Sequence, residues 1–287
     1  MRSLRQSAPL VGIGFRMPIS EWTVQNLDLF EVLEITIDHY LDGGEPQRAA
    51  IRSLVGRVPL TAHGVGLSIG TDVPLARDYL ERVATAINDL QAPCYSEHLA
   101  FTRVPGRELG NLLPLPKTRA VAEDIIDKVR AVQTIVPVPF SLENISYLFE
   151  WPDSDLSDAE FFNIICGETG AGLLLDVENL YVNSHNLGFD PYAFLDALPA
   201  EVVTGVHAAG GVSIAESFLD RPVLADSHSH PVPDQAVELL GYALRRQKPQ
   251  TVIVERDDRM HEVGELVIDM ARLRDHLSAF SAGRAHV

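Results

Sequence analysis

The sequence is poor in cysteine, with only Cys94 and Cys166 among 287 residues. Two thiols cannot build a disulfide framework or a cysteine-rich metal site, so iron–sulfur clusters and cysteine-bound structural zinc are excluded. Scarce cysteine without a disulfide framework is typical of a reducing compartment, and we expect a cytoplasmic protein. Cys94 begins a predicted strand and Cys166 falls in an apolar helical stretch, so both thiols are interpreted as packing residues.

Long apolar runs and clusters of positive charge are also absent. No apolar run reaches the roughly 20 residues that a membrane-spanning helix needs. The basic start, Met1–Gln6, is not followed by an apolar segment, which argues against a signal peptide. Lys and Arg number 23 against 40 Asp and Glu, and the net charge is −17. Such a chain binds phosphate backbones and anionic lipids poorly, so neither nucleic acid nor a membrane is the expected partner.

A substantial core and a regular alternation of elements are present. Hydrophobic residues make up 46% of the chain and charged residues 22%, which is enough for a folded core. Apolar, β-branched runs alternate with amphipathic stretches. The predicted strands are Leu10–Phe15, Val32–Ile37, Val58–Ala62, Cys94–Ala100, Val138–Leu142, Gly172–Val177, Val202–His207 and Thr251–Glu255. The predicted helices cover residues 72–90, 117–133, 157–167, 233–246 and 263–280.

The order of these elements predicts the fold. Strands that alternate with helices are typical of parallel sheets. About eight such units in one chain of this length favour a closed (β/α)8 TIM barrel over an open sheet. No repeat, low-complexity segment or linker divides the sequence. We therefore predict an α/β protein with a single TIM-barrel domain over residues 1–287 and a C-terminal helical extension.

Six of the predicted strands end on a histidine or a carboxylate. In a barrel the carboxyl ends of the strands meet at one face, where active sites of this fold lie. The residues delivered there are His63, Glu97, His98, Glu143, Asn144, Asp176, Glu178, His207 and Glu255. Each alone is more often a hydrogen-bonded loop residue or a helix cap. Together, so many acids repel one another unless a cation compensates them, and Arg16 and Arg256 are expected to neutralise only part of the set.

A second polar cluster, residues 226–230, follows the seventh strand. Alternate side chains of an extended segment share a face, so Asp226, His228 and His230 are expected to point the same way. Asp-x-His is then a chelating pair, whereas in a turn Asp226 would cap backbone amides instead. His185, after the sixth strand, is a further candidate. Imidazole and carboxylate ligands suit iron, manganese or zinc, and about nine candidates imply two or three ions.

Seven motifs occur in an order that is typical of one known family. They are His63-Gly64-Val65-Gly66-Leu67-Ser68, Ser96-Glu97-His98-Leu99-Ala100-Phe101, Glu143-Asn144-Ile145-Ser146, Asp176-Val177-Glu178-Asn179-Leu180-Tyr181-Val182, His207-Ala208-Ala209-Gly210, Asp226-Ser227-His228-Ser229-His230-Pro231-Val232-Pro233 and Glu255-Arg256-Asp257-Asp258. The pattern, from about Gly12 to Asp258, resembles the multinuclear non-heme iron-dependent oxidases, the family of the methanobactin-biosynthesis oxidase.

This resemblance implies a xylose-isomerase-like barrel that holds two or three irons. It implies that dioxygen is used to modify a residue, usually cysteine, of a ribosomally synthesised precursor peptide. A small partner protein that presents the peptide is implied as well.

The resemblance also assigns ligands, motif by motif. Three sets are implied, and the first two share a bridging Glu143: His63, His98 and Glu143; Glu143, Asp176, His207 and Glu255; Asp226, His228 and the residue at position 178. The residues of the first two sets are also the implied catalytic residues. Two places depart from the family pattern. Glu178 stands where Asn is usual, and this change affects the third ligand set. Ile37-Asp38-His39-Tyr40 replaces a Glu-Asn-Tyr stretch, and this change affects the substrate pocket.

Two other classes of function stay open at this point. Xylose-isomerase-like hydrolases and isomerases present the same strand-end ligands to zinc, manganese or magnesium, and activity without dioxygen would favour that class. The other alternative is a metal-binding scaffold without catalysis. The additional polar groups Arg16, Glu97 and Asn144 weigh against a scaffold, because an inert site does not need them.

Overall fold

The computed structural model describes residues 8–215 and 221–284, and eight of their strands close into a parallel barrel. The basic start of the chain lies outside these residues. The barrel strands are β1 (Leu10–Gly14), β2 (Val32–Thr36), β3 (Leu60–Gly64), β4 (Tyr95–His98), β7 (Phe140–Glu143), β8 (Gly172–Asp176), β9 (Val203–Ala208) and β12 (Thr251–Val254). Around the barrel their order is β1-β12-β9-β8-β7-β4-β3-β2. The predicted TIM barrel is confirmed, and every strand lies within two residues of its predicted bounds.

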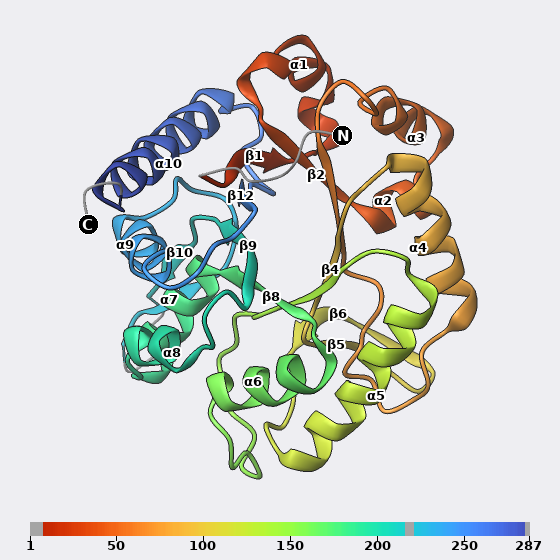
Figure 1. Ribbon diagram of the computed structural model, residues 1–287, viewed down its shortest axis with the longest axis vertical. Coiled ribbons are helices and arrows are strands. Elements are labelled where there is room, and N and C mark those ends of the chain that lie inside the picture. The colour runs from red at the N-terminus through yellow and green to blue at the C-terminus, as the bar shows by residue number, and fades with distance from the viewer. Residues whose placement is uncertain (1–7, 216–220, 285–287) are drawn as a thin grey trace.

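Helices surround the barrel on the outside (Figure 1). They are α1 (Ser20–Gln25), α2 (Ile37–Asp42), α3 (Glu45–Arg52), α4 (Arg77–Leu90), α5 (Arg119–Ile135), α6 (Asp158–Thr169), α7 (Val177–Leu187), α8 (Pro191–Ala197), α9 (Asp234–Ala243) and α10 (Val263–Arg284), with short 3-10 turns η1 (Met17–Ile19) and η2 (Leu27–Leu29). In this part of the chain, no helix combines the length and apolarity needed to cross a membrane.

The helix predicted from residue 72 begins later, at Arg77. Backbone contacts at Thr71 explain the difference. The Thr71 carbonyl oxygen accepts from the Val73 N–H at 2.8 Å and from the Lys128 ammonium at 2.6 Å. This tight turn is tied to α5, so the Asp-Val-Pro segment that looked like a helix start is a loop.

Helix starts elsewhere follow ordinary capping chemistry. Ser157 and Glu160 form a capping box at α6, and the Thr118 side chain caps α5. Asp176 ends β8 and also caps α7, because its Oδ1 accepts from the Asn179 N–H at 2.7 Å. The strand therefore passes into α7 without a linker, which is why sequence reading overlooked this helix.

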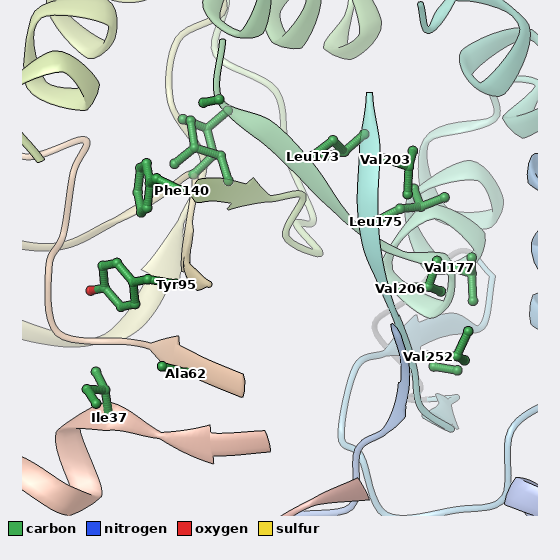
Figure 2. Packing of buried hydrophobic residues seen from close by; sticks show 14 of the residues in the cluster. Ile37, Ala62, Tyr95, Phe140, Leu173, Leu175, Val177, Val203, Val206 and Val252 are labelled. Carbon is green, nitrogen blue, oxygen red and sulfur yellow. The ribbon is translucent and has the colours of Figure 1, made fainter. Parts of the chain in front are cut away.

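The hydrophobic core lies between the strands and the surrounding helices. Tyr95 on β4 and Phe140 on β7 lie side by side with ring centroids 5.5 Å apart (Figure 2). On β9, Val206 is 1% exposed in this core, and the next residue, His207, contacts acids from other strands. Because side chains alternate along a strand, one face packs apolar residues and the other is free to carry polar ones.

Two β-hairpins extend from the carboxyl ends of barrel strands. The sequence pattern did not predict them. After β4 comes β5 (Phe101–Val104) paired with β6 (Arg107–Leu113), and after β9 comes β10 (Val212–Ile214) paired with β11 (Val223–Ala225). Both pairs are antiparallel. They place extra walls beside the mouth of the barrel.

Arg256 does not neutralise the barrel mouth, so that expectation was wrong. Arg256 is 3% exposed, and its guanidinium lies 2.8 Å from Glu265 and 3.3 Å from Asp269, both on α10. Glu255 points into the barrel, so the next side chain along the strand points outward. Arg256 anchors the last helix instead.

We expect Arg256→Met to lower the free energy of unfolding by about 3 kcal/mol, because Asp269 would stay buried without its charge partner. Arg119→Met is the control, since Arg119 pairs with Glu123 at the surface and should contribute less than about 1 kcal/mol. Urea unfolding with a chelator present measures both. Equal losses in the two variants would show that the buried pair does not anchor α10.

Candidate metal centre

Strand register brings the predicted ligands together at the carboxyl mouth of the barrel. His98 on β4 pairs in register with Glu143 on β7, and Asp176 on β8 pairs with His207 on β9. His63 belongs to β3, the other neighbour of β4. Residues up to 144 positions apart in sequence are therefore placed by backbone pairing alone.

The first set is centred on one oxygen of Glu143. The Nε2 atoms of His63 and His98 each lie 3.3 Å from Glu143 Oε2. His98 Nδ1 is 3.1 Å from the Gly64 carbonyl oxygen. A carbonyl only accepts, so Nδ1 carries the proton, and in the neutral ring Nε2 presents a lone pair. His63 Nδ1 is likewise held, at 2.9 Å from Ser96 Oγ.

The charges in this set call for a cation. Burial lowers the pKa of His98, which favours the neutral ring. Burial opposes ionisation of Glu143, but His207, His98 and His63 outweigh it and hold the pKa of this carboxyl below its ordinary value. Glu143 Oε2 is buried and has no hydrogen bond within the described residues. An ionised oxygen and an imidazole lone pair thus face the same space, which is the arrangement of a metal site.

The second set uses the other oxygen of Glu143. His207 Nδ1 lies 2.9 Å from Glu143 Oε1 and 3.1 Å from Glu255 Oε2. One atom from each of Glu143, Asp176, His207 and Glu255 lies within 4.8 Å of the others. Asp176 Oδ2 is buried without a hydrogen bond, and burial, with Glu143 nearby, raises the pKa of Asp176 well above its ordinary value. The geometry therefore gives Glu143 one oxygen for each set.

Glu34 is a functional candidate that sequence reading missed. Its Oε1 lies 2.9 Å from His207 Nε2, and it forms a third close group with His63 and His207. The other candidate ligands of the barrel lie at strand ends, whereas Glu34 lies in the middle of β2. The available signal was an acid inside the apolar run Val32–Thr36, where all five residues are buried.

The third set is only partly assembled. Asp226 Oδ1 and His228 Nε2 lie 2.6 Å apart. Glu178 Oε1 accepts from the Gly211 N–H at 2.9 Å, and burial raises the pKa of Glu178 to about 7. Glu178 Oε2, Asp226 Oδ1 and His228 Nε2 are buried without hydrogen bonds, but they do not form one of the groups with ligand atoms within 4.8 Å among the described residues.

The shared face expected for Asp226, His228 and His230 was wrong. His228 has φ +47°, a left-handed conformation that breaks the alternation of an extended segment. Its ring contacts Asp226, whereas His230 Nδ1 lies 2.8 Å from Ser229 Oγ. His185 is exposed near the end of α7 and does not join the close ligand groups found in the described chain.

Arg16 supplies positive charge at the edge of the site. Its Nη2 lies 3.3 Å from Glu255 Oε1, and its Nε lies 2.7 Å from Asp257 Oδ1. Asp257 Oδ2 in turn lies 3.0 Å from His228 Nδ1. This chain of contacts fixes the His228 ring so that Nε2 faces Asp226, the way a carboxylate orients a metal-binding histidine.

Glu97 and Asn144 support the site from behind. Glu97 Oε1 accepts from the Leu67 N–H at 3.0 Å and the Tyr95 hydroxyl at 2.9 Å. Burial, and then the charge of Asp38, raise the pKa of Glu97 to about 8. The Asn144 side chain bonds the backbone of Asp176 in both directions, at 2.9 Å each. These residues position loops and strands around the ligands.

A cleft of about 610 Å³ opens above the ligands. Its lining includes His63, His98, Glu143, Asp226, His228 and Glu255. Residues of β6, the segment after β7, and the hairpin β10–β11 complete the walls. A molecule in the cleft therefore reaches the candidate metal ligands directly.

Sequence comparison identifies relatives over nearly the whole chain. A family model described as "RiPP precursor modification enzyme MbnB/TglH/ChrH" matches residues 10–278. A UPF0276 protein from Streptomyces avermitilis is 34% identical over 96% of this chain, which spans 57% of that relative's length. A UPF0276 protein from Rhizorhabdus wittichii is 32% identical over 95% of this chain and 96% of its own.

Solved structures with the same fold are distant in sequence. D-psicose 3-epimerase with D-fructose has a TM-score of 0.59 at 12% identity, covering 93% of this chain and 97% of its own. A xylose isomerase-like TIM barrel protein from Mycobacterium smegmatis, in complex with magnesium, has a TM-score of 0.59 at 12% identity, covering 98% and 100%. At this identity the likeness shows the fold alone, and it confirms the xylose-isomerase-like barrel.

We expect the metal-free protein to lose stability as pH rises from 4.5 to 8, because folded Glu97 keeps its proton up to about pH 8 whereas the unfolded chain releases it near 4.5. Glu97→Gln should remove a slope of about 1 kcal/mol per pH unit across that window. Urea unfolding at several pH values, with Glu123→Gln as a surface control, measures it. Parallel curves for wild type and Glu97→Gln would contradict the assignment.

Proposed function

Because the chain belongs to the family of RiPP precursor modification enzymes MbnB/TglH/ChrH, we propose that it is a dioxygen-dependent, multinuclear non-heme iron oxidase. Its proposed substrate is a residue, most often cysteine, of a ribosomally synthesised precursor peptide. The observation that carries the proposal is Glu143, whose two oxygens face two separate groups of histidine and carboxylate ligands.

The donor atoms fit iron. The ligands are imidazole nitrogens and carboxylate oxygens without thiolate, a combination that suits non-heme iron. Buried ligand atoms without hydrogen bonds occur in all three proposed sets, at Glu143, Asp176 and Glu178, whereas Asp226 Oδ1 and His228 Nε2 face each other at 2.6 Å. Such atoms are costly unless a cation or a water molecule pairs with them. Bound iron would supply dioxygen activation and redox equivalents.

The proposed ligands are those of the three sets: His63, His98 and Glu143; Glu143, Asp176, His207 and Glu255; Glu178, Asp226 and His228. The first two sets are also proposed to be catalytic, because they would hold the ions at the floor of the cleft. Glu178 would add a charged oxygen where an amide is usual, and that charge would strengthen the third set for a cation.

The chain's own groups prepare the site for substrate. Ser96 and the Gly64 carbonyl hold the His63 and His98 rings with Nε2 toward Glu143. The carboxylates Glu255, Glu34 and Glu143 raise the pKa of His207 well above its ordinary value against the effect of burial. His207 must therefore give up a proton when it becomes a ligand, and the deprotonated ring is then held by Glu34 on its far side.

Partners of this enzyme would be peptides and proteins. The precursor peptide is the substrate that the family implies. A small protein that presents the peptide is proposed in addition. With a net charge of −17, the chain would attract a basic leader segment or a basic patch on that protein.

Metal content and oxygen dependence test the proposal. Protein produced with iron supplied and purified without oxygen should hold more than one iron per chain by elemental analysis. A precursor peptide encoded beside the gene should change mass only when dioxygen is admitted. Active protein with one zinc and negligible iron, or turnover in the absence of oxygen, would favour a hydrolase or isomerase of the same fold instead.

Ligand substitutions should separate the sets. We expect Glu143→Ala to abolish turnover and to lower metal occupancy at both of the first two positions, because both use this carboxylate. Glu255→Ala should remove metal from the second position and leave the first largely filled. Stoichiometry after anaerobic iron titration measures this, with Glu123→Ala as the surface control. Full iron content and turnover in Glu143→Ala would disprove the bridging role.

A further inference from the structure

Exposed hydrophobic side chains gather at the cleft. The large hydrophobic residues that stay exposed in the described chain are Val65, Val73, Val104, Leu148, Phe149, Tyr192, Ile214 and Ile268. Four of these eight, Val65, Leu148, Phe149 and Ile214, line the cleft above the candidate metal centre. Scattered exposed hydrophobics are ordinary, whereas a group around one cavity marks a binding surface.

The lining of the cleft has a polar part and an apolar part, which adjoin where Ser146 Oγ donates to Asp226 Oδ2 at 3.2 Å. The polar wall carries Arg16, Asp226, Glu255 and Asp257. The apolar wall, residues 145–149 with the end of β6 (Leu112, Leu113 and Pro114), is continued by Ile214, Val223 and Leu224 of the second hairpin. Leu148 is 65% exposed and Phe149 is 44% exposed. Water therefore covers apolar surface directly beside the ligand groups.

The side-chain charges of the cleft away from the proposed ions do not favour an anionic ligand. Among the described residues that line the cleft, Arg16 is the only Lys or Arg, and Glu255 and Asp257 already contact its guanidinium. Away from the proposed ions and the histidines that would hold them, the described lining offers a phosphate group little free positive charge. A neutral or basic peptide segment with apolar side chains complements both the acidic residues and the apolar residues of the lining.

We infer that the apolar wall is a subsite for a large aliphatic or aromatic side chain that neighbours the modified residue of the peptide. The inference rests on the proposed function for the peptide nature of the ligand. Successive residues of an extended peptide advance about 3.3 Å, so a cleft of this size takes the modified residue and its neighbours together. Phe149 is supported from behind by Trp151, with ring centroids 5.6 Å apart.

The cavity behind the wall extends the apolar surface. A second space, of about 40 Å³, shares Pro114, Ile145, Tyr147 and Phe149 with the cleft. Aromatic side chains dominate its far side, including Phe161, Phe162 and Phe194. Phe149 therefore lies between the cleft and this small space.

Two labelled peptides test the subsite: fluorescein-Gly-Phe-Cys-Phe-Gly and the same peptide with Ser in place of both Phe. Fluorescence anisotropy with zinc-loaded protein under nitrogen gives Kd without turnover. We expect the Phe peptide to bind wild type at least tenfold more tightly than the Ser peptide. The double variant Leu148→Ser with Phe149→Ser should lose that preference, and its thermal unfolding is measured beside it because Phe149 also packs on Trp151.

Ile268→Ser is the matched control, because Ile268 is 66% exposed on α10 and does not line the cleft. It should keep the full preference. Equal affinity of wild type for both peptides, or a preference that survives in the double variant, overturns the inference. Sedimentation adds a second check: a wild-type dimer that the double variant abolishes would assign the wall to a second copy of the chain and also overturn it.

The outcome is separable from that of the proposed function. Peptide selectivity in zinc-loaded protein needs neither iron nor dioxygen. Iron-dependent oxidation without selectivity would refute the subsite and leave the oxidase proposal standing. Selective binding by a protein that takes no iron would refute the oxidase and keep the subsite.

Discussion

The structure of the site depends on where the Glu143 carboxylate is placed. It is 1% exposed, with His63 and His98 on one oxygen and His207 on the other. A buried carboxylate is stable only when positive charge compensates it. In the metal-free protein His207 does so, since neighbouring carboxylates keep its pKa high. Metal binding would then replace the protons of His207 and Asp176 with cations.

The barrel fold allows these charged side chains to lie close together. Parallel register sets His98 beside Glu143 and Asp176 beside His207, while the opposite faces of the same strands pack apolar side chains against helices. The core and the polar interior are thus separate layers of the same strands. Substituting a ligand changes charge in one layer and leaves the apolar contacts of the other in place, so metal content and stability should be measured side by side.

Sequence alone predicted the eight strands because apolar runs have a clear period, and it predicted most ligand candidates because strand ends share one face. It missed features set by local conformation or long-range contact. The Pro105-Gly106 turn of the first hairpin was a usable signal, with Gly106 at φ +78°. Glu34 was signalled by an acid inside an apolar run, and the outward direction of Arg256 by the alternation that follows Glu255. The left-handed conformation of His228 depends on the folded chain and has no comparable sequence signal.

Arg16 links the parts of the site that register does not fix. The first two ligand sets lie on barrel strands, whereas Asp226 and His228 lie on a loop, and His228 is held left-handed. The Asp257 N–H donates to the His228 carbonyl at 2.8 Å while its carboxylate contacts the ring. Arg16 contacts both Asp257 and Glu255. The third ligand set therefore depends on a charge network that begins at Glu255, a ligand of the second set. We expect the geometry of the third set to change with metal binding at the second set more than with metal binding at the first.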